Sequence, residues 1–446
     1  MSVQLQVGEF NQSLLDFLAS SPTPFHATST LVDALVNKGF TLIHEQDFWT
    51  LTPGNKYVFT RNQSSVIAFI YGEDTLLESG IRMLGAHTDS PCLKLKPNPE
   101  LNRHGYYQLG VEVYGGALLA PWFDRDLSMA GRVTFKNAAG NIESCLIDFK
   151  RALAIIPSLA IHLDREANAG RNINPQRDII PVLMQLEQGK LLPNLHELLA
   201  AQVAAEHPYL TITADAILDF EISFYDTQAP AVIGVENQFI ASARLDNLLS
   251  CFVGLKAICE ATTQVSSIFI CTDHEEVGSA SCCGAKGPML EQFLERLLPD
   301  AQERFRVLEK SLMISADNAH GIHPNFSDRH DENHKPMLNQ GPVIKVNANQ
   351  RYATTSETSA VFKLLCDKTQ VPFQTFVART DMGCGSTIGP IVASEVGVRT
   401  LDVGVPTFAM HSIRELAGTL DAWYLYQVAA AFFNYQEAPV PSHRLK

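Results

Sequence analysis

Several features of other protein classes are missing from this sequence. No apolar run approaches the roughly 18 residues of a membrane-spanning helix, although 46% of the 446 residues are hydrophobic. The first residues lack the basic and apolar regions of a secretory signal peptide. The nine cysteines are odd in number and form no Cys-x-x-Cys pair, which argues against a disulfide framework and against a structural zinc site. We therefore expect a cytoplasmic protein with reduced thiols.

Blocks of basic residues are also missing. The chain has 34 Lys and Arg against 48 Asp and Glu, a formal net charge of −14, and its pI is near 5.4. Neither nucleic acid nor an anionic membrane surface is indicated as a partner. The acidic balance is compatible with a site that holds cations. The length suggests two or three domains.

Helix-type and strand-type patterns alternate at both ends of the chain. This alternation predicts an α/β fold with a mostly parallel sheet flanked by helices. The expected strands are residues 56–61, 65–71, 81–87, 267–271, 312–316, 373–377 and 400–403. The expected helices are residues 8–20, 26–38, 245–259, 289–298, 360–368 and 420–435.

The pattern changes from about Pro97, where short strands and glycine turns begin. We expect strands at 107–114, 131–136, 143–149 and 217–224, and a helix at 193–205. The simplest architecture is one catalytic α/β domain, made of residues 1–95 and 236–446, interrupted by a β-rich insertion of residues 96–235.

Two adjacent glutamates, Glu275 and Glu276, follow the apolar run of residues 267–271. A metallohydrolase needs one carboxylate to hold a cation and another to move protons on its water. The alternative is a solvated acidic loop. The nearby Cys282 and Cys283 are interpreted as buried, inert thiols rather than as a metal or redox site.

Five further polar segments lie at strand ends or open a helix. Open α/β sheets place ligands at such positions, outside the carboxyl ends of their strands. The segments are residues 85–91, 243–247, 315–325, 379–387 and 410–415.

Three of these segments offer ligand candidates. In the first, His87 is followed by Asp89, and a carboxylate near a metal-binding imidazole fixes its tautomer. His87 is equally readable as a buried, hydrogen-bonded histidine. Asp246 opens a helix and is alternatively an N-cap. Asp317 ends a strand and precedes two histidines, although a polar loop would explain it too.

The other two segments are weaker. Gly383 and Gly385 would let the backbone approach a ligand closely, or would simply form a tight turn. His411 precedes a charged pair, and a lone histidine is more often structural. Together the segments supply imidazole and carboxylate ligands that suit Zn, Mn or Co at a hydrolytic site. A bridging carboxylate between two metals would let them activate one water.

The ordered set of segments resembles one enzyme family. It comprises Gly-Ala-His-Thr-Asp-Ser-Pro (85–91), Arg-Leu-Asp-Asn (244–247), Asp-His-Glu-Glu-Val-Gly-Ser (273–279), Ser-Ala-Asp-Asn-Ala-His-Gly (315–321) and Met-His-Ser-Ile-Arg-Glu (410–415). Further matches are Ser-Pro-Thr-Pro-Phe-His-Ala (21–27), Tyr-Gly-Gly (114–116), Trp-Phe-Asp-Arg-Asp-Leu (122–127) and Pro-Ser-Leu-Ala-Ile-His-Leu (157–163). The chain resembles the M18 aspartyl aminopeptidases, which are dinuclear zinc exopeptidases, over nearly its whole length.

The resemblance implies two Zn²⁺ per subunit, with Mn²⁺ or Co²⁺ as possible replacements. His87, Asp317 and a bridging Asp246 would hold one ion. Asp246, Glu276 and His411 would hold the other. The resemblance also implies a fold of the zinc exopeptidase type and the release of N-terminal residues from peptides, with a preference for Asp and Glu.

Other roles follow from the same resemblance. Glu275 would be the general base and Asp89 the partner of His87. Lys345 would recognise the acidic side chain, and His162 of the insertion would reach a neighbouring subunit's active site. The insertion would serve dimerisation and assembly into a tetrahedral homododecamer. The alternatives are a two-metal aminopeptidase of broader or neutral specificity and a non-catalytic, metal-stabilised assembly protein.

Overall fold

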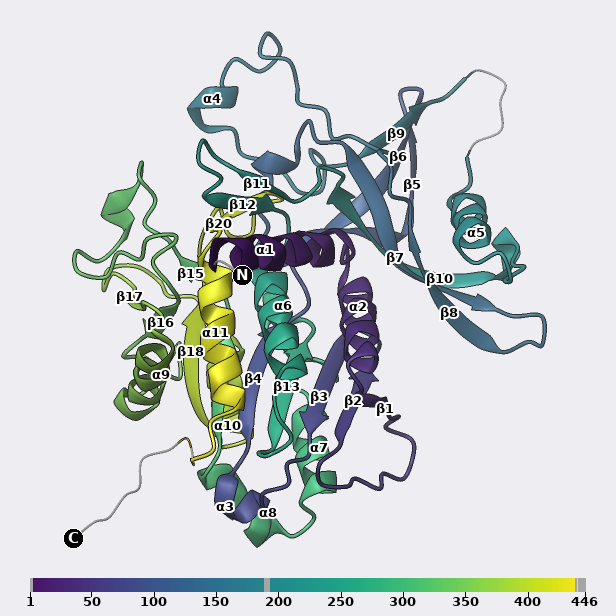
Figure 1. Cartoon of the computed structure of the whole chain (residues 1–446). Helices are drawn as coiled ribbons and strands as arrows, with labels where there is room; N and C mark the ends of the chain where they lie inside the picture. The colour runs from purple at the N-terminus through teal and green to yellow at the C-terminus, as the bar shows by residue number, and fades with distance from the viewer. Residues whose placement is uncertain (1–2, 188–192, 438, 440–446) are drawn as a thin grey trace. The chain divides into compact units, whose positions relative to one another are not determined.

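In a computed structural model that describes residues 3–187, 193–437 and 439, the chain forms a large mixed sheet flanked by helices (Figure 1). By its internal contacts the chain separates into two units. The first unit comprises residues 1–89, 230–410 and 415–446. The second unit comprises residues 90–229 and 411–414. The assignment of residues 96–235 to dimerisation and assembly stays a prediction.

The large sheet belongs to the first unit and has the order β1-β2-β3-β13-β4-β14-β18-β16-β17. Its central strands β13, β4, β14 and β18 pair in parallel, whereas β2–β3, β3–β13 and β18–β16 pair antiparallel. The predicted α/β class with a mostly parallel sheet is confirmed. The strands are β1 Thr41–Leu42, β2 Lys56–Arg61, β3 Ser65–Ile70, β13 Ser267–Thr272, β4 Arg82–His87, β14 Leu312–Ala316, β18 Arg399–Gly404, β16 Val343–Val346 and β17 Gln374–Val377.

Helices cover both faces of this sheet because its strands are apolar on both sides. In β3, Val66 and Ala68 pack into one core while Ile67 and Phe69 pack into the other. The first core includes residues of α1 Val3–Ala19, α2 Pro24–Asn37, α6 Leu245–Cys259, α9 Ser356–Thr369 and α11 Asp421–Phe433. Figure 1 shows α2, α6 and α11 over one face. The second core includes residues of α3 Leu76–Ser79, α7 Met289–Leu297, α8 Ala301–Glu309 and α10 Ile388–Glu395.

Local sequence explains why these helices begin and end where they do. The side chain of Thr23 accepts the backbone N–H of His26 at the start of α2, and Pro24 occupies a first-turn position. Gly39 follows the C-cap with φ +86°, as expected for a left-handed helix end. Helix α6 spans the predicted residues 245–259.

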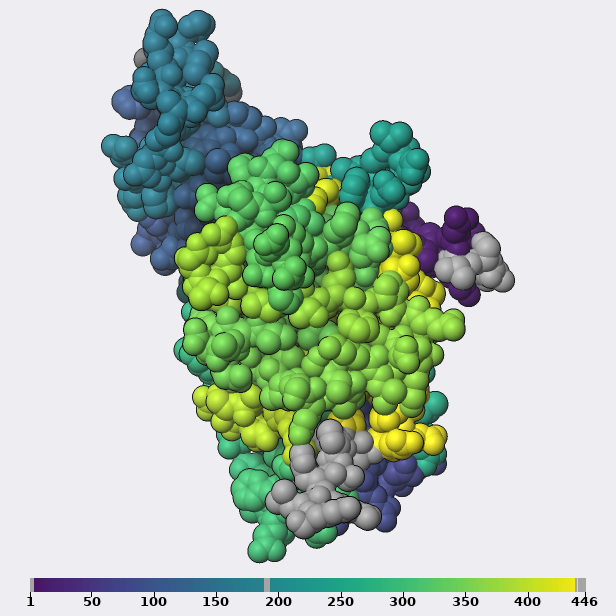
Figure 2. Space-filling model, turned by 90° about the vertical axis from the view of Figure 1, so that its left-hand side faces the viewer, coloured from purple at the N-terminus to yellow at the C-terminus, as the bar shows by residue number. Residues whose placement is uncertain are grey.

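The sequence analysis did not predict a smaller sheet that lies in the first unit. It has the order β11-β12-β20-β19-β15 and consists of very short strands. They are β11 Ala231–Ile233, β12 Phe239–Ser242, β20 Glu415–Gly418, β19 Pro406–Phe408 and β15 Ala319–His320. Seen from the side of β16 and β17, the visible surface of this unit comes mostly from the last third of the chain, coloured green to yellow (Figure 2).

The second unit is built on an antiparallel sheet with the order β8-β7-β10-β5-β6-β9. Helix α5 (Leu195–Glu206) packs against this sheet through Leu199 and Val203. The strands are β8 Ile142–Asp148, β7 Leu127–Lys136, β10 Ile217–Asp226, β5 Cys92–Arg103, β6 Tyr106–Tyr114 and β9 Val182–Gln185. The β-rich character expected of the insertion is thus present.

Strand β5 runs across the position, about Pro97, at which the sequence pattern changes. The strand continues through Pro97 and Pro99 to Arg103. The strand tolerates both prolines because its register against β6 shifts between Leu95 and Glu100, where no regular ladder requires their missing N–H groups.

Membrane insertion by a helix finds no support in the part of the chain that the structure describes. None of its helices combines the length and the apolar character needed to cross a bilayer.

Candidate metal centre

Three neighbouring parallel strands place the predicted site residues at one edge of the large sheet. Strand β4 ends at His87, β13 ends just before Asp273 and the glutamate pair, and β14 ends just before Asp317. Strand β4 lies between β13 and β14 and pairs with both in parallel. Their carboxyl ends therefore meet, as expected for a ligand site of an open α/β sheet.

An imidazole and several carboxylates converge at this edge. The Nε2 atom of His87 lies 3.4 Å from Oδ1 of Asp246 and 3.9 Å from Oδ1 of Asp317. One ligand atom each of His87, Asp246 and Glu276 lies within 4.8 Å of the other two. Four of the five predicted metal ligands are thus in the same unit and at the same edge of its sheet.

Asp246 is not the helix N-cap that one reading of the sequence predicted. The N-cap position of α6 is held by Arg244, whose backbone is left-handed at φ +59° and whose side chain makes no capping bond. Asp246 lies past the cap with non-helical angles of φ −84° and ψ 105°. Its N–H donates to Oε2 of Glu415 at 2.9 Å. This local distortion turns the Asp246 carboxylate toward His87, which a capping role would not do.

Asp89 connects His87 to the glutamate pair. The Nδ1 atom of His87 lies 3.0 Å from the backbone carbonyl oxygen of Asp89 and 3.4 Å from its carboxylate. The Asp89 carboxylate accepts the backbone N–H groups of Glu275 at 3.1 Å and Glu276 at 3.0 Å. Donation from Nδ1 directs Nε2 of His87 toward Asp246 and Asp317, the orientation that a metal ligand requires.

The charges of these groups shift one another's pKa values. Burial lowers the pKa of His87, but its contacts with Asp246, Asp317 and Asp89 outweigh burial and raise it well above its usual value. Burial acts to raise the pKa of Asp317, but the Lys345 ammonium and His87 together hold it below its usual range. The Nζ atom of Lys345 lies 3.7 Å from Oδ2 of Asp317.

The glutamate pair shows the opposite effect. Burial, with the nearby carboxylates of Asp317, Asp246 and Asp89, raises the pKa of Glu275 to about 8. Burial and Asp246 raise the pKa of Glu276 to about 10. A bound divalent cation would remove the repulsion behind these shifts. Oxygen and imidazole donors in this arrangement fit zinc, and equally Mn²⁺ or Co²⁺.

Two predicted histidines lie in the second unit. His411 belongs to the short segment 411–414, and its Nδ1 atom lies 3.2 Å from the carbonyl oxygen of Gly116. His162 is exposed in a turn of that unit. The assignment of His411 as a metal ligand and of His162 as a group that acts on a neighbouring subunit stay predictions.

The predicted glycines border open space. Gly383 lines a cavity of about 300 Å³ in the first unit, together with residues that include His320, Phe376, Met382 and Phe408. A Cβ atom at Gly383 or Gly385 would meet nothing within 4 Å. The protein's own packing therefore does not require glycine at either position, and their role in substrate binding stays a prediction.

The sequence analysis missed two contacts of the centre. Glu415 holds the backbone of Asp246, and Lys345 lies beside Asp317. Glu415 was visible only as part of a charged pair after His411. No local signal reveals its partner, because 169 positions separate it from Asp246 along the chain.

Comparison with known proteins identifies relatives over nearly the whole chain. The family described as Aminopeptidase I zinc metalloprotease (M18) matches residues 17–433. A probable M18 family aminopeptidase 2 of Pseudomonas syringae pv. tomato is 58% identical over 431 residues, covering 97% of this chain and 99% of the relative. The corresponding protein of Pseudomonas paraeruginosa is 59% identical over the same coverage.

Solved structures show the same fold. A chain in the cryo-EM structure of the Ape4 and Nbr1 complex has a TM-score of 0.93 at 37% identity, covering 96% of this chain and 86% of that chain. The mApe1 dodecamer of S. cerevisiae has a TM-score of 0.82 at 27% identity, covering 95% of this chain and 96% of that chain.

We expect the Asp89→Asn variant to bind zinc less tightly. The amide nitrogen that replaces one carboxylate oxygen cannot accept the N–H of Glu275 or Glu276. Loss of a group that orients metal ligands typically lowers affinity about 10- to 100-fold. Competition with a chromogenic chelator measures this affinity. Asp47→Asn, which changes the formal charge equally at an exposed position, is the control. Equal zinc affinity in both variants would contradict the orienting role of Asp89.

Proposed function

The chain belongs to the M18 family of zinc aminopeptidases, and on that premise we propose that it removes acidic N-terminal residues from peptides with two metal ions and a glutamate base. The observation that carries this proposal is the convergence of His87, Asp246 and Glu276 within 4.8 Å. Asp317 directly follows β14, and its Oδ1 atom lies 3.9 Å from Nε2 of His87.

The ligands divide between two ions in this proposal. His87, Asp317 and Asp246 would hold the first, and Asp246, Glu276 and His411 would hold the second. The contact of His87 Nε2 with both Asp246 and Asp317 supports the first group. When bound, the zinc pair supplies positive charge that polarises the scissile carbonyl and makes a water more acidic.

Glu275 moves the protons. Its carboxylate accepts a proton from the attacking water and returns it to the leaving amine. Support comes from its backbone, which Asp89 fixes next to Glu276.

Self-association completes the site in this proposal. His162 from a neighbouring subunit stabilises the oxyanion of the tetrahedral intermediate. The insertion joins subunits into dimers and then into a tetrahedral homododecamer. The similarity to the dodecameric mApe1 supports assembly of this kind.

In the first candidate function, an aminopeptidase that prefers acidic residues, Lys345 selects the substrate side chain. Its Nζ atom lies 3.7 Å from Oδ2 of Asp317, so its ammonium group lies close to the proposed metals. A positive charge there favours Asp or Glu at the substrate's N-terminus.

The contacts of Lys345 also support a second candidate function, an aminopeptidase of broader or neutral specificity. Lys345 is buried, its Nζ donates to the carbonyl oxygen of Asn318 at 3.0 Å, and it lies over the ring of Tyr352. These contacts, with the pairing to Asp317, describe a structural lysine. The cavity bordered by Phe376, Met382 and Phe408 would then accept an apolar side chain.

We expect Glu275→Gln to retain both metals and to lose turnover about 10²- to 10⁴-fold, the usual contribution of a general base. The amide keeps the size of the carboxylate but cannot accept a proton. Metal analysis and kcat on a dipeptide measure the two effects. Glu291→Gln, at an exposed position of α7, is the control. Near wild-type turnover in Glu275→Gln would show that another group is the base.

A substrate panel separates the two specificities. Chromogenic Asp, Glu, Leu and Lys substrates are compared on metal-stripped enzyme that has been reconstituted with Zn²⁺, Mn²⁺ or Co²⁺. We expect Asp and Glu to be preferred, and Lys345→Met to lower kcat/KM for Asp roughly 10- to 100-fold, as for a lost charged hydrogen bond. Lys136→Met, at an exposed position, should change nothing. Preference for Leu would remove the selective role of Lys345.

Chelation tests whether the metals serve catalysis or only assembly. Because the proposed centre is an open site that takes substrate, we expect a chelator to abolish activity and added Zn²⁺ to restore it. Light scattering should show the same oligomer before and after chelation. If the oligomer dissociates at the rate at which activity disappears, the metals hold subunits together and a structural role gains support.

A further inference from the structure

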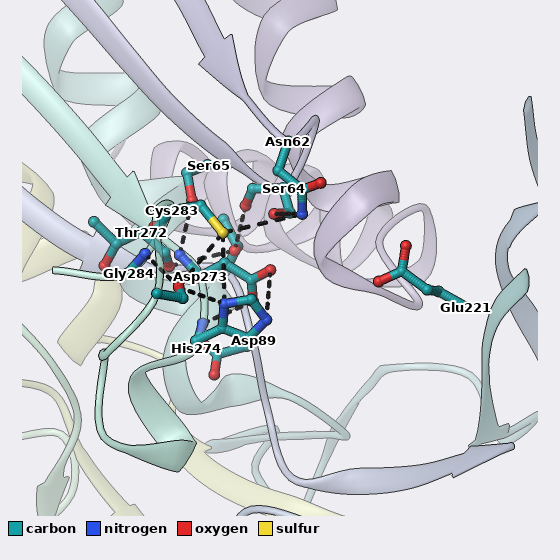
Figure 3. Close-up of polar contacts among 12 residues, drawn as sticks. Asn62, Ser64, Ser65, Asp89, Glu221, Thr272, Asp273, His274, Cys283 and Gly284 are labelled. Carbon is teal, nitrogen blue, oxygen red and sulfur yellow. Dashed lines mark hydrogen bonds and ion pairs between the residues drawn. The ribbon is translucent and has the colours of Figure 1, made fainter. Parts of the chain in front are cut away.

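A second cluster of metal-binding side chains lies directly before the glutamate pair. It consists of Asp273, His274 and Cys283, which offer a carboxylate, an imidazole and a thiol (Figure 3). One ligand atom of each lies within 4.8 Å of the other two. The proposed dinuclear centre uses none of these three residues, and its predicted ligands include no sulfur.

The backbone around this cluster is held in place. Asp273 directly follows β13, and its N–H donates to the carbonyl oxygen of Cys283 at 3.2 Å. The hydroxyl of Ser65, the first residue of β3, donates to the same carbonyl at 2.7 Å. These bonds fasten the returning loop to the edge of the large sheet, so the side chains of Asp273 and Cys283 stand on a fixed frame.

One of the contacts has the spacing of two ligands of one cation. The Sγ atom of Cys283 lies 3.5 Å from Nδ1 of His274, whereas Oδ2 of Asp273 lies 3.5 Å from Nε2, the other nitrogen of the ring. One cation binds only one of these nitrogens, so the Asp273 carboxylate would have to turn toward Nδ1 to join the sulfur. Tetrahedral zinc bonds of ~2.3 Å to sulfur and ~2.05 Å to nitrogen place the two ligand atoms roughly 3.6 Å apart. The sulfur and the imidazole therefore need little movement to share one ion.

The Ser281 hydroxyl lies next to the sulfur and the imidazole. Its Oγ atom lies 2.8 Å from Nδ1 of His274 and 3.6 Å from Sγ of Cys283. The hydroxyl thus contacts both candidate ligand atoms at once. On binding of a cation it would supply a fourth oxygen or leave that position to water.

The two adjacent cysteines differ. Cys283 is buried, and although burial opposes its ionisation, hydrogen bonds with His274 and Ser281 lower the pKa of its thiol. Cys282 is exposed, and slight burial and the neighbouring Cys283 raise its pKa. The prediction of buried thiols therefore holds for Cys283 and is wrong for Cys282. Cys282 provides a matched control one residue away.

We propose that Asp273, His274 and Cys283 form a site for one thiophilic divalent cation, Zn²⁺ or Cd²⁺, additional to the proposed dinuclear centre. Thiolate, imidazole and carboxylate are all zinc ligands, and the thiolate sets this site apart by its preference for softer ions. Bound cation links the end of β13 to the loop at Cys283. It thereby stabilises the segment that leads into Glu275 and Glu276.

Cadmium titration of the zinc-loaded protein tests this proposal without reference to activity. The ultraviolet thiolate-to-cadmium charge-transfer band reports only ions that are bound through sulfur. We expect the wild type and Cys282→Ser to gain this band and saturate at one Cd²⁺ per chain. Cys283→Ser should lack it. Binding should raise the melting temperature of the wild type and of Cys282→Ser, but not that of Cys283→Ser.

Two further variants keep the test decisive if Cys283→Ser folds poorly. His274→Asn and Asp273→Asn retain the thiol, and we expect each to weaken cadmium binding at least tenfold, since each removes a ligand. Far-UV circular dichroism without cadmium checks their folding. Absence of the band in the wild type, its loss in Cys282→Ser, or unchanged affinity in both His274→Asn and Asp273→Asn would show that the three side chains form only a hydrogen-bonded cluster.

Discussion

Asp89 holds the glutamate pair and His87 in fixed positions relative to each other. It accepts the N–H groups of Glu275 and Glu276, and the same residue contacts Nδ1 of His87 through its carbonyl oxygen. The two glutamates follow β13 and His87 ends β4, so one side chain ties together the ends of two neighbouring parallel strands. The direction of His87 Nε2 and the position of both glutamate side chains depend on these bonds.

Buried negative charge is the second constraint. Asp246, Asp317 and Glu276 surround one imidazole, and Lys345 beside Asp317 contributes a positive charge. Burying like charges is costly unless they bind a cation or take up protons. Burial and the neighbouring carboxylates raise the pKa values of Glu275 and Glu276, which reflects this cost. Divalent cations of the proposed kind would relieve it, which links metal binding to the integrity of this sheet edge.

One loop joins two kinds of ligand chemistry. Glu276 offers a hard oxygen donor to the centre at His87, whereas Asp273, His274 and Cys283 add a thiol a few residues away. The chain changes direction between these two groups of donors as it leaves β13. The change lies at His274, whose backbone is left-handed at φ +62°. Hard oxygen donors and a soft sulfur donor give the two proposed sites different metal preferences, although the sites lie close together along the chain.

Those parts of the protein that depend on local pattern could be predicted from the sequence. Strands β2 and β14 and helix α6 occupy the predicted residues, because burial periodicity and flanking turns are properties of short segments. Because the polar segments follow strand ends, the sequence also predicted that His87 and Asp317 would lie at one edge of the sheet. Tertiary structure alone decided what depends on distant partners. Pro97 lies within a strand because a register shift spares its missing N–H, Asp246 faces His87 instead of capping a helix, and Cys283 meets His274 across a returning loop. Local propensity cannot encode such contacts, since their energy exists only once remote segments have packed together.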